Sequence, residues 1–91
     1  MDFEWDEAKS QRNLRERGFG FDLGALIFEG PVLERVDTRR DYGEVRVQAI
    51  GEADGLVLFV TYTDRGEVRR IISARIAKQR ERDAWLSFVG H

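Results

Sequence analysis

The chain has 91 residues, of which 42% are hydrophobic and 35% charged, with a formal net charge of −2. That length suits one domain with a single core, so we expect residues 1–91 to form one domain. Cysteine is absent and the only histidine is His91, which excludes disulfides and thiolate metal sites and argues against histidine catalysis. Because the sequence has no membrane-length apolar run and no basic leader, we expect a cytoplasmic protein without metal, cofactor or membrane contact.

The first part of the chain predicts a short strand followed by two helices. Residues 1–5 alternate apolar and acidic side chains, as a short edge strand does. Residues 7–17 are mostly good helix formers, with Asp6 placed to cap the helix and Gly18 placed to end it. A second, shorter helix is expected within residues 21–28.

The second part predicts a meander of strands and a final helix. Strands are expected at residues 32–36, 44–51, 56–63 and 67–73, and a helix at 74–89. The third of these strands is almost continuously apolar, which indicates a central strand covered on both faces. Short turns pair neighbouring strands antiparallel, so we expect an α+β fold with helices packed on an antiparallel sheet of four or five strands.

Positive charge is concentrated near the end of the chain. Between Arg65 and Arg82 lie six arginines and one lysine against two acids, within a protein that is negative overall. Such a segment fits either a polyanion or an acidic protein partner.

The expected alternation along residues 67–75 divides these arginines between two faces of a strand. Arg69, Ser73 and Arg75 are predicted to share one face, while Arg70 points to the other. Glu44 and Arg46 are likewise predicted to share a face of an earlier strand. If the two polar faces lie on the same side of the sheet, a carboxylate and three guanidinium groups converge.

This set of side chains fits a phosphodiester site. Arginine binds phosphate in a bidentate manner, and Glu44 or Lys9 could accept a proton from an RNA 2′-hydroxyl. Arg69 or Arg75 could stabilise the charge that develops on the phosphate, without a metal ion. The alternative is that Glu44 and Arg46 form an ordinary solvated cross-strand pair.

The chain resembles the BrnT toxins of bacterial type II toxin–antitoxin modules over most of its length. The resemblance rests on these motifs, in order: Trp5-Asp6-x-x-Lys9-x-x-x-Asn13, Arg17-Gly18-x-x-Phe21, Glu44-x-Arg46 and Arg70-Ile71-Ile72-Ser73-Ala74-Arg75-x-Ala77.

The resemblance implies a RelE-like ribonuclease fold with two N-terminal helices and a C-terminal helix, and an endoribonuclease that stops translation. It also implies a BrnA-like, DNA-binding antitoxin, a toxin–antitoxin heterotetramer and contact with operator DNA only through that antitoxin. The matching positions predict catalytic roles for Lys9, Glu44, Arg46, Arg69 and Arg75, and RNA-binding roles for Asn13, Arg17, Arg70 and Ser73.

One position departs from the family pattern. The family usually carries histidine where this chain has Arg17, which puts a general acid in doubt but leaves phosphate binding possible. Two alternatives therefore stay open: a toxin that has lost catalysis and only binds its antitoxin, and a generic RNA-binding domain.

Overall fold

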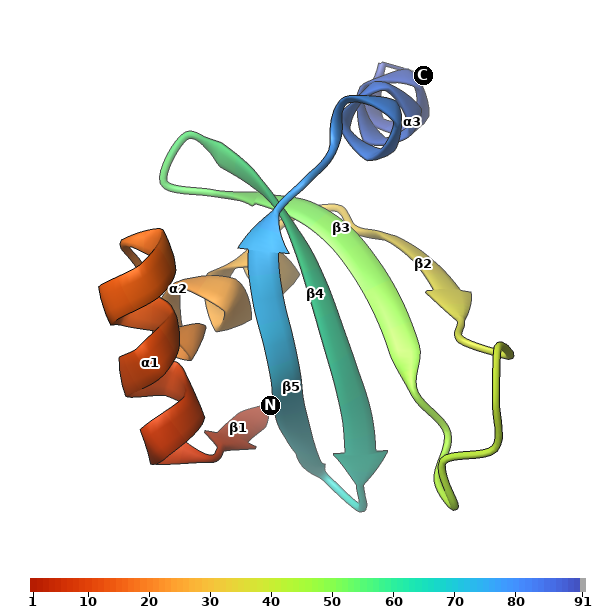
Figure 1. Cartoon of the computed structure of the whole chain (residues 1–91). Coiled ribbons are helices and arrows are strands. Elements are labelled where there is room, and N and C mark those ends of the chain that lie inside the picture. The colour runs from red at the N-terminus through yellow and green to blue at the C-terminus, as the bar shows by residue number, and fades with distance from the viewer. Residues whose placement is uncertain (91) are drawn as a thin grey trace.

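The computed structural model describes residues 1–90 and has the expected α+β composition (Figure 1). The elements in chain order are β1 (Asp2–Trp5), α1 (Glu7–Arg17), α2 (Phe21–Ala25), the 3-10 helix η1 (Leu26–Glu29), β2 (Leu33–Val36), β3 (Val47–Ala53), β4 (Leu56–Arg65), β5 (Val68–Ile76) and α3 (Gln79–Val89). The strands form one sheet in the order β1-β5-β4-β3-β2. The almost continuously apolar strand β4 is therefore central, as predicted, but the expectation that both its faces are covered holds only in part, because Thr61 on the open face is partly exposed.

The sheet is mixed, so the prediction of an antiparallel sheet is wrong at one edge. Strands β2 to β5 pair antiparallel, with short turns between β3, β4 and β5 and the longer segment 37–46 between β2 and β3, but β1 pairs parallel with β5. The rule that short turns give antiparallel pairs does not apply to β1, because the helices and three strands separate it from β5 in the chain.

Helix α1 is bounded as the sequence predicts. The Asp6 carboxylate accepts a hydrogen bond from the Lys9 backbone N–H, and Gly18 ends the helix in the left-handed conformation at φ 88°. Other boundaries shift: β3 begins at Val47, and β5 continues to Ile76, so α3 begins only at Gln79.

One face of the sheet carries the main core under α2 and η1. Ile27 of η1 and Leu58 of β4 are fully buried there, and each contributes about 1.5–3 kcal/mol relative to exposure. Helix α2 lies close to β5 at Gly24, where an added Cβ would come within 3.1 Å of the Ala74 Cβ. A larger residue would push the helix away from the sheet.

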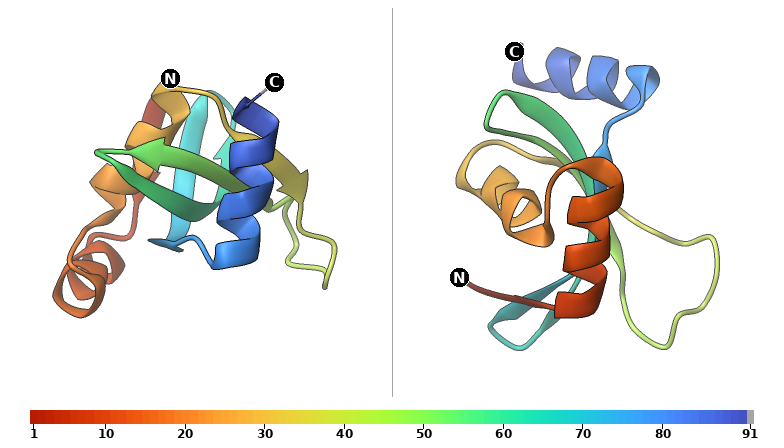
Figure 2. Two further views of the ribbon diagram at one scale, coloured as in Figure 1. Left: turned by 90° about the horizontal axis from the view of Figure 1, so that it is seen from above. Right: turned by 60° about the vertical axis from the view of Figure 1, so that its left-hand side comes forward.

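The opposite face, called here the open face, is covered only at its two ends (Figure 2). Helix α3 crosses one end, where Trp85 packs on Ile50 and Phe59. The segment 37–46 lies over the other end, where the Thr63 hydroxyl donates a 2.7 Å hydrogen bond to the Val45 carbonyl. The middle of the open face lies between these two covers. Within residues 1–90, no helix is long and apolar enough to cross a membrane.

Candidate functional site

A bulge in β5 changes which arginines share the open face. Tyr62 lies opposite Ile71 whereas Thr61 lies opposite Ser73, so Ile72 is an extra residue in β5. The alternation of faces reverses at that point. Arg70, Ser73 and Arg75 consequently lie on the open face, opposite Thr63, Thr61 and Phe59, respectively.

Arg69 lies on the opposite face, so the prediction that it joins Ser73 and Arg75 is wrong. Its guanidinium stacks 4.7 Å from the Phe28 ring centre and 3.9 Å from that of Tyr62. It also donates hydrogen bonds of 2.8 and 3.0 Å to the Asp64 carboxylate. These hydrogen bonds raise the pKa of Arg69 above its ordinary value. Arg69 is thus a packing residue.

The remaining predicted groups meet in a hollow of about 130 Å³ where α1 approaches β5. This Lys9 hollow is lined by Asp6, Lys9, Glu44, Arg46, Arg65, Arg70, Ile71 and Ile72. Helix α1 supplies the lysine, the segment before β3 supplies Glu44 and Arg46, and β5 supplies Arg70. The hollow brings Lys9, Glu44 and Arg46 together with Arg70 in place of Arg69, and their catalytic roles stay a prediction.

Charges inside the Lys9 hollow are only partly neutralised. Glu44 lies 3.4 Å from Arg65 and 3.7 Å from Arg46, and Arg70 lies 3.2 Å from Glu4. Lys9 forms no ion pair with any other residue in the described chain. The hollow therefore keeps an excess of positive charge, with four basic side chains against the carboxylates of Asp6 and Glu44.

Arg46 is held rigidly, yet one of its donors is unused. Its guanidinium stacks 4.1 Å from the centre of the Tyr42 ring. The Tyr42 hydroxyl donates to Asp37, a buried carboxylate that also accepts from Arg39. The Arg39 hydrogen bonds hold the pKa of Asp37 well below its usual range. Among residues 1–90, Arg46 Nε is the only buried side-chain nitrogen or oxygen without a hydrogen-bond partner, and the Glu44 carboxylate lies 3.7 Å from it.

Arg75 lies on the open face but outside the Lys9 hollow. Thr63, opposite Arg70, is four residues from Phe59, opposite Arg75, which is roughly 13 Å along a strand. Arg75 stacks 4.1 Å from the Phe59 ring centre and binds Glu81 of α3 through two hydrogen bonds of 2.8 and 2.9 Å. One phosphate group cannot contact both arginines, and Arg75 chiefly holds α3.

The Arg75–Glu81 pair should make folding stability depend on pH. The Arg75 hydrogen bonds, with a smaller contribution from the Lys78 backbone N–H, lower the pKa of Glu81. A carboxyl with a lowered folded-state pKa stabilises the fold above its unfolded pKa, and this contribution is lost as the pH falls through the folded value.

We expect Glu81→Gln to lower the free energy of unfolding at pH 7, and the difference from wild type to shrink below the ordinary pKa of 4.5. Urea unfolding at several pH values measures this. Glu67→Gln, in the exposed turn after β4, is the control, and a difference that does not vary with pH would contradict the assignment.

Two positions predicted to bind RNA have structural partners instead. Asn13 is buried: its amide donates to the Phe19 carbonyl at 2.9 Å and its oxygen accepts from Arg17. Arg17 also donates to the Ala74 carbonyl at 3.1 Å, so it ties the end of α1 to β5. Arg17 is eight residues from Lys9, about 12 Å along the helix. The residue that replaces the family histidine therefore lies outside the Lys9 hollow.

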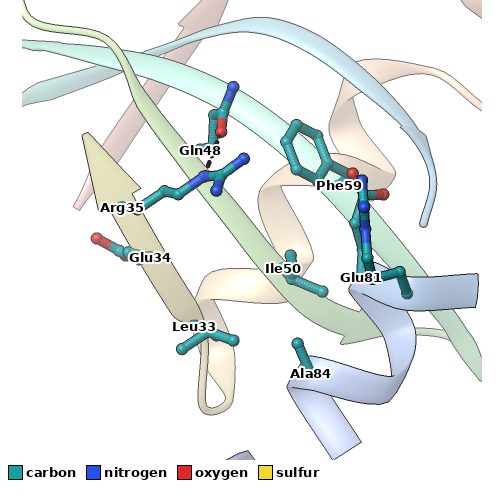
Figure 3. Close-up of a pocket in the computed structure, with 9 residues that line it drawn as sticks. Leu33, Glu34, Arg35, Gln48, Ile50, Phe59, Glu81 and Ala84 are labelled. Atoms are coloured by element: carbon teal, nitrogen blue, oxygen red, sulfur yellow. Dashed lines mark hydrogen bonds between the residues drawn. The ribbon is translucent and has the colours of Figure 1, made fainter. Parts of the chain in front are cut away.

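A larger groove of about 530 Å³ lies beside α3 on the open face (Figure 3). This α3 groove is lined by Leu33, Glu34, Arg35, Gln48, Ile50, Phe59, Arg80, Glu81 and Ala84. Sequence reasoning missed Arg35 and Gln48 as candidate site residues. Alternation would have placed Gln48 on the face of Arg46, but only the pairing of β2 with β3 brings Arg35 opposite it.

The Lys9 hollow thus combines an ammonium group, guanidinium groups and the carboxylates of Asp6 and Glu44 at the protein surface. Guanidinium and ammonium groups bind phosphate, and a carboxylate can accept a proton. No group of three or more potential metal ligands occurs among the histidine, cysteine and acidic side chains of residues 1–90. The fold and site together define a small α+β protein with a surface suited to a phosphate-bearing ligand.

Comparison with protein families identifies the family to which the chain belongs. Residues 5–81 match the model of the family described as the ribonuclease toxin, BrnT, of type II toxin–antitoxin systems. The chain therefore belongs to the BrnT family of ribonuclease toxins, and an antitoxin partner follows from that membership. No curated protein matches the chain.

Proposed function

We propose that this protein is a metal-independent endoribonuclease that cuts RNA in the Lys9 hollow. The observation that carries the proposal is the convergence of Lys9, Glu44, Arg46 and Arg70 from separate segments around one hollow. The alternative, an ordinary solvated pair of Glu44 and Arg46, would involve only those two side chains and does not account for the presence of Lys9 and Arg70. Family membership supplies the class of substrate.

The proposed reaction is an attack of the RNA 2′-hydroxyl on the adjacent phosphorus. Glu44 accepts the 2′-hydroxyl proton, and the 2′ oxygen forms a bond to phosphorus. Arg46 and Arg70 bind the phosphate oxygens as negative charge develops on them. The bond to the 5′ oxygen breaks, and the Lys9 ammonium donates a proton to this leaving oxygen. The products are a 2′,3′-cyclic phosphate and a 5′-hydroxyl end.

The wider assembly is also part of the proposal. RNA cleavage would inhibit translation in the cytoplasm, with residues 1–91 as a single RelE-like toxin domain. A BrnA-like antitoxin would neutralise the toxin in a heterotetramer and hold it at the operator for repression of the shared operon. The Lys9 hollow supports neutralisation by an acidic antitoxin segment, because it keeps unpaired positive charge.

The deciding experiment incubates the purified chain with single-stranded RNA in the presence of a chelator. We expect cleavage that persists in the chelator and products that carry a 2′,3′-cyclic phosphate, detected by mass spectrometry. Loss of cleavage on chelation would contradict the metal-independent mechanism. Intact RNA in every buffer would instead favour a binding module, as would salt-sensitive RNA binding without turnover.

The structure favours an enzyme over the two binding alternatives. The doubt about catalysis came from Arg17, which replaces the family histidine. Arg17 binds the Ala74 carbonyl near the far end of α1, whereas Lys9 and Glu44 line the hollow. The departure therefore leaves the proposed catalytic groups in place.

A further inference from the structure

We propose that the α3 groove binds a guanine base of the RNA close to the cleaved phosphate, and so sets where the protein cuts. The inference rests on the proposed ribonuclease function and adds a recognition site to it. The groove lies on the same open face as Arg70 and Arg46, toward α3.

The polar groups of the groove are mainly hydrogen-bond donors. Gln48 is only 6% exposed and its side-chain oxygen accepts a 2.8 Å hydrogen bond from Arg35 Nε. This contact fixes the amide oxygen, and the NH₂ group has no hydrogen-bond partner among residues 1–90. The terminal nitrogens of Arg35 and the guanidinium of Arg80 add further donors on the rim.

The acids of the groove are already engaged. Glu81 is bound by Arg75, and Glu34 accepts a 2.8 Å hydrogen bond from the Tyr62 hydroxyl. Both Glu81 oxygens are bound by Arg75, and the Glu34 carboxylate bonds to Tyr62 on the opposite face of the sheet, so neither acid offers the groove a free acceptor. The groove consequently selects a ligand edge that carries acceptors.

The apolar part of the groove suits a flat ring. Ile50 and Phe59, which are 9% and 8% exposed, form its floor, with the Arg75 guanidinium stacked on the Phe59 ring, while Leu33 and Ala84 line opposite sides on β2 and α3 (Figure 3). Single-stranded RNA is commonly recognised by placing an unstacked base against such side chains and bonding its edge. Guanine presents two acceptors, O6 and N7, on one edge, which is the arrangement that arginine reads.

The spacing on the sheet connects the groove to the Lys9 hollow. Gln48 lies opposite Thr61, and Thr61 is two residues from Thr63, which lies opposite Arg70. Two residues of a strand span roughly 7 Å and the two strand spacings from β5 to β3 add roughly 10 Å, so Arg70 and Gln48 lie about 12 Å apart. A nucleotide next to the phosphate held by Arg70 therefore extends its base toward Gln48. An acidic antitoxin segment fits the groove less well, because the buried amide and the flat floor match a base edge.

The test uses the full chain and a randomised single-stranded RNA pool, with the product ends sequenced. We expect guanine to be enriched about tenfold or more at one position within two nucleotides of the cut. Arg35→Gln and Gln48→Leu should each bring that enrichment close to one. Arg15→Gln, on the exposed side of α1, makes the same charge change outside the groove and should leave the enrichment unaltered. Arg35 is exposed, so its variant remains informative if the Gln48 variant fails to fold.

Three results would overturn the proposal. The first is cleavage without a preferred base, and the second is a preference that persists in both groove variants. The third is an Arg35→Gln variant that loses antitoxin affinity but keeps the base preference. If the wild-type protein cuts no RNA, the NMR signal of the Gln48 side-chain amide tests guanine binding in the α3 groove separately from the ribonuclease function. A change in the chemical shift of this amide with guanosine monophosphate, but not with cytidine monophosphate, supports guanine binding even though catalysis fails. No change with guanosine monophosphate refutes guanine binding.

Discussion

Replacing Glu44 by glutamine is expected to lower the rate of RNA cleavage by about 10²–10⁴-fold, the usual contribution of a positioned general base. Glutamine keeps the size of the side chain and removes its ability to accept the 2′-hydroxyl proton. The ion pairs of Glu44 with Arg46 and Arg65 are 3.7 and 3.4 Å long and partly solvated, so their loss should change folding stability little. The effect should therefore appear in turnover rather than in the amount of folded protein.

Single-turnover cleavage at saturating protein measures this loss directly. Glu67→Gln, in the turn after β4, makes the same chemical change away from the Lys9 hollow and is the matched control. Circular dichroism shows whether each variant is folded. A Glu44→Gln variant that is folded and cleaves within threefold of the control would remove Glu44 from the proposed mechanism.

Exchanging Arg70 and Arg69 separately for glutamine is expected to give opposite results. Arg70→Gln removes a phosphate ligand from the Lys9 hollow and should slow cleavage by about 10²–10³-fold. Arg69→Gln removes the bidentate contact with Asp64 and the stacking on Phe28 and Tyr62, so its main effect should be a lower melting temperature. The two variants are neighbours of identical chemistry, and each is the control for the other.

Cleavage rate and melting temperature are measured on both proteins under the same conditions. The bulge at Ile72 predicts that the larger loss of rate belongs to Arg70→Gln and the larger loss of stability to Arg69→Gln. If Arg69→Gln slows cleavage more while remaining equally stable, then the register of β5 in the active protein differs from the one described.

Local signals in the sequence were sufficient for the order and type of the elements. Asp6 and Gly18 mark the ends of α1, and the turn at Asp54 and Gly55 has the two positive φ angles, 52° and 79°, that the Asp-Gly pair favours. The parallel pairing of β1 was not predictable from turns, because no turn connects it to β5. The pairing of β1 with β5 depends on how the helices and strands between them pack.

The site was predicted in part, for a definite reason. Lys9, Glu44 and Arg46 were assigned together, and the hollow unites them. Arg70 enters the hollow instead of Arg69 because Ile72 is an extra residue in β5, and no glycine or proline in this strand marks its position. The α3 groove was missed because its parts come from separate strands and a helix, and only their packing creates it.

The stacking of Arg46 on Tyr42 also affects how tightly a phosphate is held. A free arginine side chain carries about 2 kcal/mol of rotamer entropy, which it loses when a ligand fixes it. Here the ring of Tyr42, itself anchored by the buried Asp37, restricts the guanidinium before any RNA arrives. The loss of freedom therefore occurs when the protein folds and not when it binds, which leaves more of the contact energy available to discriminate the transition state from the bound substrate.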